Sequence, residues 1–586
     1  MTVTGCHGIF PTVSASNRRV TSAAVRVRVL VPLYAALAVV VTWPLAAHLT
    51  TGLTRGTEPV ATVPLFNLWT LRWNQDSIGD RFRHYWDAPL FHPALGGFAL
   101  SEPQPLTGLV FAPLALVTGN PVLALNLVLL AALVANGIAA QRLARTLGAA
   151  PVPAAVTGGL AVALPFVAAQ LGVLQLVMVF PLFLLVDAVV RWGPEGGRRA
   201  AAEVGLWLAV TFLTCGYYGL FAAVVIGPAT LAYVRRDWLS RSRAADIAVM
   251  ALVVGVLAGP ALIGQARITA DYSRDEETIE GLSASNADFW RIPDESPLAG
   301  ILPLADDGDR GHALYPGTVL LALGITGLIV AARRVGDGAG SGMRRRQLTF
   351  LVVGFVLARL LSLGLNLDVF GYRPYELLRR WVPGFDSLRS PFRSDVVGQV
   401  FTVALAAFAL DAAWRWLRPE EGRARVPLAA GAALGVAVVA LALVETGVAP
   451  APVHLVDRST PDWAGWLAEN PPEGDGDPVL AFLPFPEDGR AGSYQPTVEH
   501  MLDVLDADAT TVNGYSGLFP GPYNDLEGAA RQYPDYHADD LMAEYGVDAV
   551  VVDEEWLAGN PAAASALDAT YREMYRGPDS IVYEPL

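Results

Sequence analysis

The apolar run VLVPLYAALAVVVTWPLAA, residues 29–47, is followed by the stretch GTEPVATVPLFNLWTLRWN, residues 56–74. A helix needs about 20 mostly apolar residues to cross the hydrocarbon core of a bilayer, and the first run is of that length. The second stretch places a carboxylate, Glu58, shortly after the run ends. The apolar run and the stretch that follows it together predict a chain that crosses a membrane and then places a carboxylate near the membrane surface.

The residues after Glu58 have the pattern of an amphipathic helix. One face carries the aromatic residues Phe66, Trp69 and Trp73. The same spacing gives a polar stripe of Asn67, Thr70 and Asn74. We expect this helix to lie in the interface plane with its tryptophans at headgroup depth, which would hold Glu58 near the lipid phosphates.

Further apolar runs dominate the chain up to residue 448. Hydrophobic residues make up 53% of the sequence, mean hydropathy is +0.39, and charged residues are only 17%, against about 25% in a typical soluble domain. The composition therefore predicts a polytopic α-helical membrane protein with about eleven spans. The expected spans are 29–47, 121–141, 152–171, 173–191, 203–216, 217–234, 245–264, 315–332, 348–364, 396–414 and 428–447.

Arginine predicts the orientation of these spans. The chain has no lysine, and its 41 basic residues are all arginine, clustered on alternate loops. Because cytoplasmic loops retain positive charge, residues 1–28 are expected to be a cytoplasmic tail in a cytoplasmic (inner) membrane. The spanning part is then 29–448, with a large external loop at 48–120. Asp187 and Asp411 fall near cytoplasmic helix ends, where we expect them to contact water.

The segment 449–586 differs from the rest in charge and pattern. It holds 26 acidic residues and 5 arginines, which disfavours nucleic acid as a partner. DPVLAFLPF, GVDAVVVD and DSIVYEPL have the pattern of strands, and helices are expected near 499–506, 522–531 and 537–545. We therefore predict an extracytoplasmic α/β domain. It carries no phosphate-binding or nucleophile motif that would indicate catalysis of its own.

Carboxylates and arginines of the external loops are the candidates for chemistry. Transfer from a lipid phosphate needs a base for the acceptor hydroxyl and cations for the leaving phosphate. Glu58 is the candidate base and Glu102 a second acid; the alternatives are a turn cap and a helix-start role. The candidate donor phosphate-binding residues are Arg389, Arg393, Arg72, Arg83 and Arg359. The alternatives are headgroup anchoring for Arg389 and Arg393, a solvated or headgroup-facing surface for Arg72 and Arg83, and snorkelling for Arg359.

Aromatic and amide side chains are candidates for binding a sugar or an acceptor. They are Trp69, Trp73, His84, Asn513, Tyr515 and Tyr523. For the three in the Gly/Pro-rich loop VNGYSGLFPGPY, packing against the membrane part is the alternative. His84 and His92 lack a third ligand at a suitable spacing, so no metal site is assigned, and a divalent cation such as Mg²⁺ or Mn²⁺ stays open.

Four motifs together resemble the GT-C superfamily of polyprenyl-phosphate-sugar-dependent membrane glycosyltransferases. They are GTEPVATVPLFNLWTLRWN; LFHP, SEPQPLTG and GNPVLALNLVLL before the second span; LRSPFR (388–393) after WVPGF; and VNGYSGLFPGPY. Members of that superfamily often carry GDP where this chain has Glu58, so the side chain here is longer by one methylene. The resemblance implies a GT-C-like fold, a lipid-phosphate sugar donor, an acceptor in the cell envelope, and inverting transfer on the outer face.

Two other function classes fit a polytopic chain. A transporter or flippase of a lipid-linked substrate should show interrupted helices in two similar halves. The sequence has helix breaks, but no clear internal repeat. A non-catalytic scaffold for envelope assembly would use the C-terminal domain to bind a partner. Long loops on one face only favour the enzyme.

Overall fold

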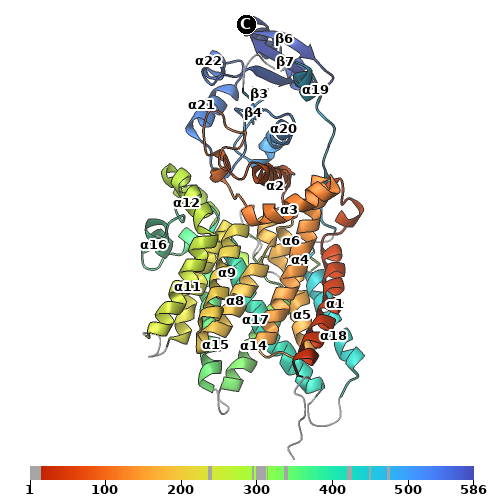
Figure 1. Ribbon diagram of the computed structural model, residues 1–586, viewed down its shortest axis with the longest axis vertical. Helices are drawn as coiled ribbons and strands as arrows, with labels where there is room; N and C mark the ends of the chain where they lie inside the picture. The colour runs from red at the N-terminus through yellow and green to blue at the C-terminus, as the bar shows by residue number, and fades with distance from the viewer. Residues whose placement is uncertain are drawn as a thin grey trace, which may run out of the picture.

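The computed structural model describes residues 15–234, 240–292, 296–297, 312, 314–335, 341–418, 425–447, 450–470 and 476–586. The first half of the predicted N-terminal tail, residues 1–14, lies outside these residues. Figure 1 shows a long helical bundle with a smaller part, made of strands and helices, stacked on one of its ends.

The bundle contains a helix at every predicted apolar run. Seven described helices are long and apolar enough to cross a membrane, and a bent pair, α11 with α12 at 63°, makes an eighth. The chain is thus a multi-pass membrane protein, and the larger number of about eleven spans stays a prediction. The helices are α1 (Ala15–Val41), α4 (Pro121–Thr146), α5 (Pro151–Val162), α6 (Pro165–Ala169), α7 (Leu174–Val177), α8 (Phe180–Glu195), α9 (Arg198–Thr214), α10 (Gly216–Ala229), α11 (Arg241–Leu257), α12 (Gly259–Ile268), α14 (Thr318–Val335), α15 (Ser341–Ser362), α17 (Asp395–Leu417) and α18 (Leu428–Thr446).

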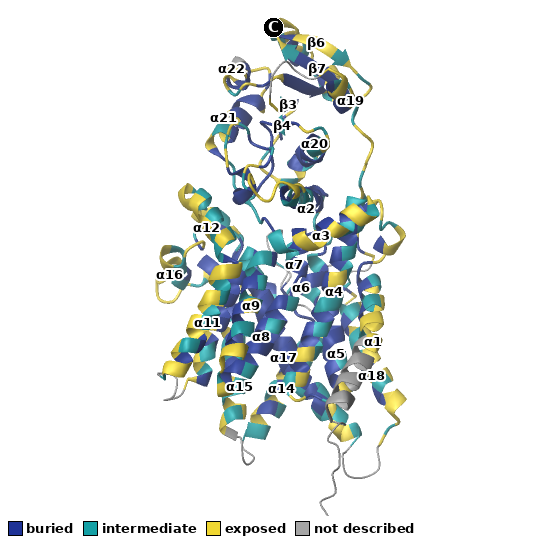
Figure 2. Ribbon diagram, in the orientation of Figure 1, coloured by how far each residue is buried: buried dark blue, intermediate teal, exposed yellow. Residues whose placement is uncertain are grey.

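Burial separates the centre of the bundle from its periphery, as Figure 2 shows. Helix α17 is buried along most of its length. Peripheral helices expose large apolar side chains, such as Leu252 of α11 at 65% and Leu434 of α18 at 54%. An apolar outer surface is stable against lipid tails but not against water, so this periphery is the surface that would contact lipid.

Helices α2 (Thr62–Gly79) and α3 (Pro105–Thr118) lie between the bundle and the smaller part, as Figure 1 shows. Helices α13 (Glu276–Gly281) and α16 (Pro374–Trp381) both contact the 3₁₀ turn Gly364–Asn366 that follows α15. Helix α2 forms where the amphipathic helix is predicted, but the expectation that Trp69 contacts lipid headgroups is wrong. Trp69 is only 1% exposed, and its ring packs against Phe66 and Phe98. The smaller part covers α2, contacting it through α20 (Gln495–Asp506). The tryptophan face is therefore an interface inside the protein and not a headgroup anchor.

The smaller part is built on a five-stranded sheet of order β4-β3-β5-β7-β6. Strands β4, β3 and β5 are parallel, whereas β7 and β6 run antiparallel to their neighbours. The strands are β3 (Val479–Leu483), β4 (Thr510–Thr511), β5 (Ala549–Asp553), β6 (Tyr571–Arg576) and β7 (Ser580–Pro585). Its other helices are α19 (Asp462–Glu469), α21 (Gly521–Ala530), α22 (Tyr536–Glu544), α23 (Glu554–Gly559) and α24 (Pro561–Thr570). β3, β5, β7, α20, α21 and α22 lie at the six predicted segments.

A two-stranded sheet ties the two parts together near Glu58. β1 (Gly52–Thr54) pairs antiparallel with β2 (Val453–Leu455). The loop that carries Glu58 is therefore fixed at one end by the segment that leads into the smaller part.

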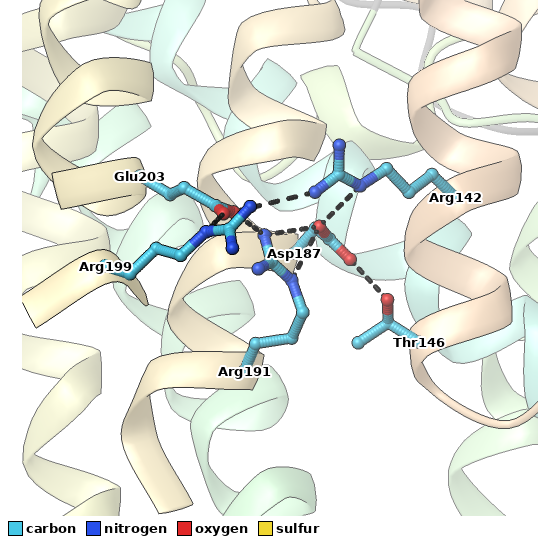
Figure 3. Close-up of polar contacts among 6 residues, drawn as sticks. All are labelled: Arg142, Thr146, Asp187, Arg191, Arg199 and Glu203. Atoms are coloured by element: carbon cyan, nitrogen blue, oxygen red, sulfur yellow. Dashed lines mark hydrogen bonds and ion pairs between the residues drawn. The ribbon is translucent and has the colours of Figure 1, made fainter. Parts of the chain in front are cut away.

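Buried ion pairs join helices at the opposite end of the bundle. Figure 3 shows Asp187 of α8 between Arg142 of α4 and Arg191, with distances of 2.9 and 3.0 Å to Oδ2. Asp411 of α17 accepts from Arg415 at 2.7 Å. Both aspartates are at most 2% exposed, so the expectation that they contact water is wrong. Each gains fixed arginine partners that offset the cost of burying a carboxylate.

Candidate active site at the junction of the two parts

Glu58 is positioned by a loop that docks into a break between helices. The Thr57 amide donates to the carbonyl of Ala169 (2.9 Å), at the end of α6, and the Thr54 hydroxyl donates to Leu171 (3.0 Å). Gly56 has a φ of +58°, a conformation that side chains rarely adopt. These two hydrogen bonds, to the end of α6 and the segment after it, together with the turn at Gly56, thus fix the position of Glu58 at the end of the bundle.

Arg389 and Arg393 approach Glu58 from the start of α17, far along the chain. Arg393 belongs to the 3₁₀ turn Pro391–Ser394, and its guanidinium lies 5.2 Å from the centre of the Tyr217 ring. Within the described residues, neither arginine has a carboxylate at ion-pair distance, and the Nε of Arg393 is buried with no hydrogen-bond partner. Both cations therefore keep capacity to bind an anion.

Opposing effects act on the Glu58 carboxyl group. Glu58 is half-buried, and burial raises its pKa, whereas Arg393 and then Arg389 lower it. No direct ion pair joins Glu58 to either arginine among the residues described. The three charges thus interact across a distance longer than a salt bridge.

Glu102 caps a helix beside this group. Its carboxylate accepts the backbone N–H groups of Gly216 (2.8 Å) and Tyr217 (3.1 Å), at the first turn of α10. Burial raises the pKa of Glu102, and these two hydrogen bonds and Arg393 lower it. The helix-start alternative thus fits Glu102, although the helix is α10 and not α3. Its contact also fixes Tyr217, whose ring faces Arg393.

Two further side chains, Tyr515 and Arg274, lie near Arg389 and come from other parts of the chain. Tyr515, on the loop after β4, is 9% exposed; burial raises the pKa of its hydroxyl, and the charge of Arg389 lowers it. Arg274 follows α12, and Arg389 lowers its pKa after the larger effect of burial. Arg274 is not among the sequence candidates, because two acidic neighbours in DYSRDE make it look like an ordinary solvated residue.

Arg72 and Arg359 are engaged elsewhere. Arg72 forms two hydrogen bonds with Asp506 of α20, at 2.9 and 2.6 Å. Arg359 lies 2.9 Å from Asp395 and 4.4 Å from the centre of the Phe289 ring. The first pair fastens α2 to the smaller part, and the second joins α15 to α17, so neither charge is free for a phosphate.

The remaining candidates do not converge on Glu58. The Asn513 amide is used by the backbone of Phe482, and the Tyr523 hydroxyl donates to Glu527 (3.0 Å). Trp73 donates to the Tyr85 carbonyl at 2.9 Å. Arg83 and His84 are exposed on the turn after α2. These side chains support the fold or face water, and of the predicted acceptor residues only Tyr515 lies at the site.

The carboxylates here do not fit a divalent cation. Glu58 faces two guanidinium groups, which would repel Mg²⁺ or Mn²⁺, and both oxygens of Glu102 already accept N–H groups. Hard cations need several oxygen ligands. Within the described part of the chain, no group of three or more His, Cys, Asp or Glu side chains is arranged to hold a metal.

Residues 88–439, more than half of the chain, match the family model described as "Domain of unknown function (DUF6311)". The chain belongs to the DUF6311 family. No curated protein matches the DUF6311 sequence.

Solved structures resemble this DUF6311 protein at low identity. The archaeal oligosaccharyltransferase AglB from Archaeoglobus fulgidus, in complex with an inhibitory peptide and a dolichol-phosphate, is 12% identical, with a TM-score of 0.50 over 95% of this chain and 74% of that one. The arabinofuranosyltransferase AftD from Mycobacteria is 13% identical, with a TM-score of 0.55 over 95% of this chain and 40% of AftD. One is an oligosaccharyltransferase and the other an arabinofuranosyltransferase, and the DUF6311 protein shares their fold.

Proposed function

We propose that this DUF6311 protein is a membrane glycosyltransferase that moves a sugar from a polyprenyl-phosphate donor to an acceptor of the cell envelope. The observation that carries the proposal is the grouping of Glu58 with Arg389 and Arg393 at one end of the bundle. A base beside cations that lack carboxylate partners is the arrangement that transfer from a lipid phosphate requires. AglB was solved with a dolichol-phosphate, which supports a lipid-linked donor here by fold alone.

The proposed reaction is an inverting displacement. An acceptor hydroxyl attacks the anomeric carbon of the sugar while Glu58 accepts the hydroxyl proton. A new glycosidic bond forms as the bond between that carbon and the phosphate oxygen breaks, and polyprenyl phosphate leaves with the bonding electrons. Arg389 and Arg393 stabilise the negative charge that develops on the leaving phosphate. Burial raises the pKa of Glu58, which makes the carboxylate a stronger base, and these arginines oppose that rise by favouring the ionised form.

The proposed location is the outer face of the cytoplasmic membrane, with the N-terminus in the cytoplasm. Support comes from the distribution of charge. The C-terminal part, with 26 acidic residues and 5 arginines, is joined to the Glu58 loop by the β1–β2 pair, while Arg142 and Arg191 lie near the C-terminal ends of α4 and α8. Arginine is retained on the cytoplasmic side, so the acidic part is expected outside.

The proposal is tested by turnover of defined donors. Purified protein in nanodiscs is given a panel of labelled polyprenyl-phosphate sugars and a mixture of envelope glycans, and release of polyprenyl phosphate is measured. Release with at least one donor is expected. If no donor is consumed, but the protein in liposomes moves a labelled lipid-linked sugar between leaflets, the transferase proposal is wrong and the flippase alternative stands.

A further inference from the structure

The loop after β4 is fixed on the helical bundle by backbone contacts. Phe91 donates its amide to Asn513 (3.1 Å), and Leu518 donates to Leu100 (3.0 Å). A Cβ atom on Gly517 would lie 2.8 Å from the Leu100 carbonyl oxygen, closer than real Cβ atoms approach. Only a glycine fits at that point, so the loop follows the bundle surface at backbone distance.

This loop contacts two arginines of the candidate site. The Arg274 guanidinium donates to the Gly517 carbonyl. Arg389 lies close enough to Tyr515 for its charge to lower the pKa of that hydroxyl, which burial raises. The Nε of Arg274 is buried without a hydrogen-bond partner among the described residues. The loop therefore holds Arg274, and the charge of Arg389 lowers the pKa of Arg274 after the larger effect of burial, so the two cations lie close enough to repel each other. An anion bound between them would reduce that repulsion.

Tyr515 is itself held rigidly by the bundle and by its own part of the chain. Its ring meets that of Phe66, on α2, edge-on at 5.3 Å, and lies 5.2 Å from the ring of Tyr494. A side chain packed in this way has little rotational freedom, so its hydroxyl has a defined position.

We propose that the loop Asn513–Phe519 is a positioning element that presents Arg274 and Arg389 to the phosphate of the lipid donor. In this arrangement Arg274 is a third phosphate-binding cation, and Tyr515 and Gly517 are positioning residues that act through the arginines. The inference rests on the proposed function, and it gives the C-terminal part a role at the site although that part has no catalytic motif of its own.

The test is binding of undecaprenyl phosphate to the full-length protein in nanodiscs, with the donor KM and kcat measured on the same samples. Loss of one hydrogen bond to a charged group corresponds to about tenfold to hundredfold in affinity. We expect Arg274→Ala to weaken binding by that factor and Arg274→Lys to restore part of it. Tyr515→Phe, which keeps the packed ring, should raise the donor KM severalfold with little change in kcat or in the melting temperature.

The matched control is Tyr545→Phe, which removes a tyrosine hydroxyl bonded to Pro522 in the same part of the chain, away from the arginines. It should bind the lipid as wild type does. The inference is wrong if Arg274→Ala and Tyr515→Phe both bind normally while Arg389→Ala and Arg393→Ala do not. If those last two variants also bind normally, the proposed function itself fails.

Discussion

Gly56 and Gly172 lie against each other where the Glu58 loop meets the break between α6 and α7. A Cβ atom on Gly56 would lie 3.0 Å from the Gly172 amide nitrogen, and one on Gly172 would overlap the Arg55 carbonyl. Neither residue can carry a side chain without moving the loop. The position of Glu58 thus depends on a contact between two backbones.

The first prediction follows from that contact. Gly172→Ala should push residues 55–58 away from the bundle, since overpacking of a close contact costs about 1–3 kcal/mol. We expect donor turnover to fall at least tenfold, with a small drop in melting temperature. Gly79→Ala is the control, because a Cβ atom there meets nothing within 4 Å. Equal turnover in the two variants would show that the loop does not position Glu58.

The second prediction concerns the cations next to Glu58. Arg389→Ala and Arg393→Ala should each weaken binding of undecaprenyl phosphate by about tenfold to hundredfold, because each removes a charge-assisted contact. Equilibrium binding in nanodiscs measures this. Arg83→Ala, which removes an exposed arginine on the same membrane face, should leave the affinity unchanged. Normal binding by both site variants would remove the phosphate site from the proposal.

The third prediction separates a structural arginine from these two. Arg72 is 18% exposed and its partner Asp506 is 65% exposed, and exposed pairs contribute about 0.2–1 kcal/mol. A double-mutant cycle with Arg72→Ala and Asp506→Ala should show a coupling energy of that size in thermal unfolding. Lipid binding should not change in either variant. A loss of lipid affinity in Arg72→Ala as large as in Arg389→Ala would contradict the assignment of Arg72 to docking.

The fourth prediction is a pH dependence of stability from Asp503, on α20. Burial, followed by the charges of Asp506, Glu499 and Asp457, raises the pKa of Asp503 to about 7, against an opposing effect of Arg72. A carboxyl whose pKa is raised on folding costs nothing below the unfolded pKa and costs stability as pH rises toward the folded value. Asp503→Asn should therefore raise the melting temperature at pH 8 but not at pH 4, by a free energy of up to about 4 kcal/mol. An equal effect at both pH values would exclude this cause.

The residue types that a reaction needs were easier to predict from the sequence than the surroundings of each side chain. Glu58, Arg389 and Arg393 were grouped by what a lipid-phosphate reaction needs, and the fold brings them to one place. Trp69 shows the limit, because an aromatic helix face has the same pattern whether headgroups or another part of the chain covers it. Asp187 had a signal in its i, i+4 neighbour Arg191, but the second partner, Arg142, lies on another helix and could not be foreseen.

Arg274 and Glu102 show a second limit. Their roles depend on partners that only the fold supplies, the Gly517 carbonyl for Arg274 and the first turn of α10 for Glu102. A hydrogen bond from a side chain to a distant backbone group cannot be predicted from the pattern of residue types in the sequence. Residues of this kind become visible only when the segments are placed in space.

The most direct measurement of the central claim compares wild type with Glu58→Gln in a single turnover of a lipid-phosphate sugar, with donor binding measured on the same nanodiscs. Removing a general base lowers the rate by about 10²–10⁴-fold. We expect release of polyprenyl phosphate to slow by that factor while the lipid still binds. Release by Glu58→Gln at the wild-type rate would show that Glu58 is not the base.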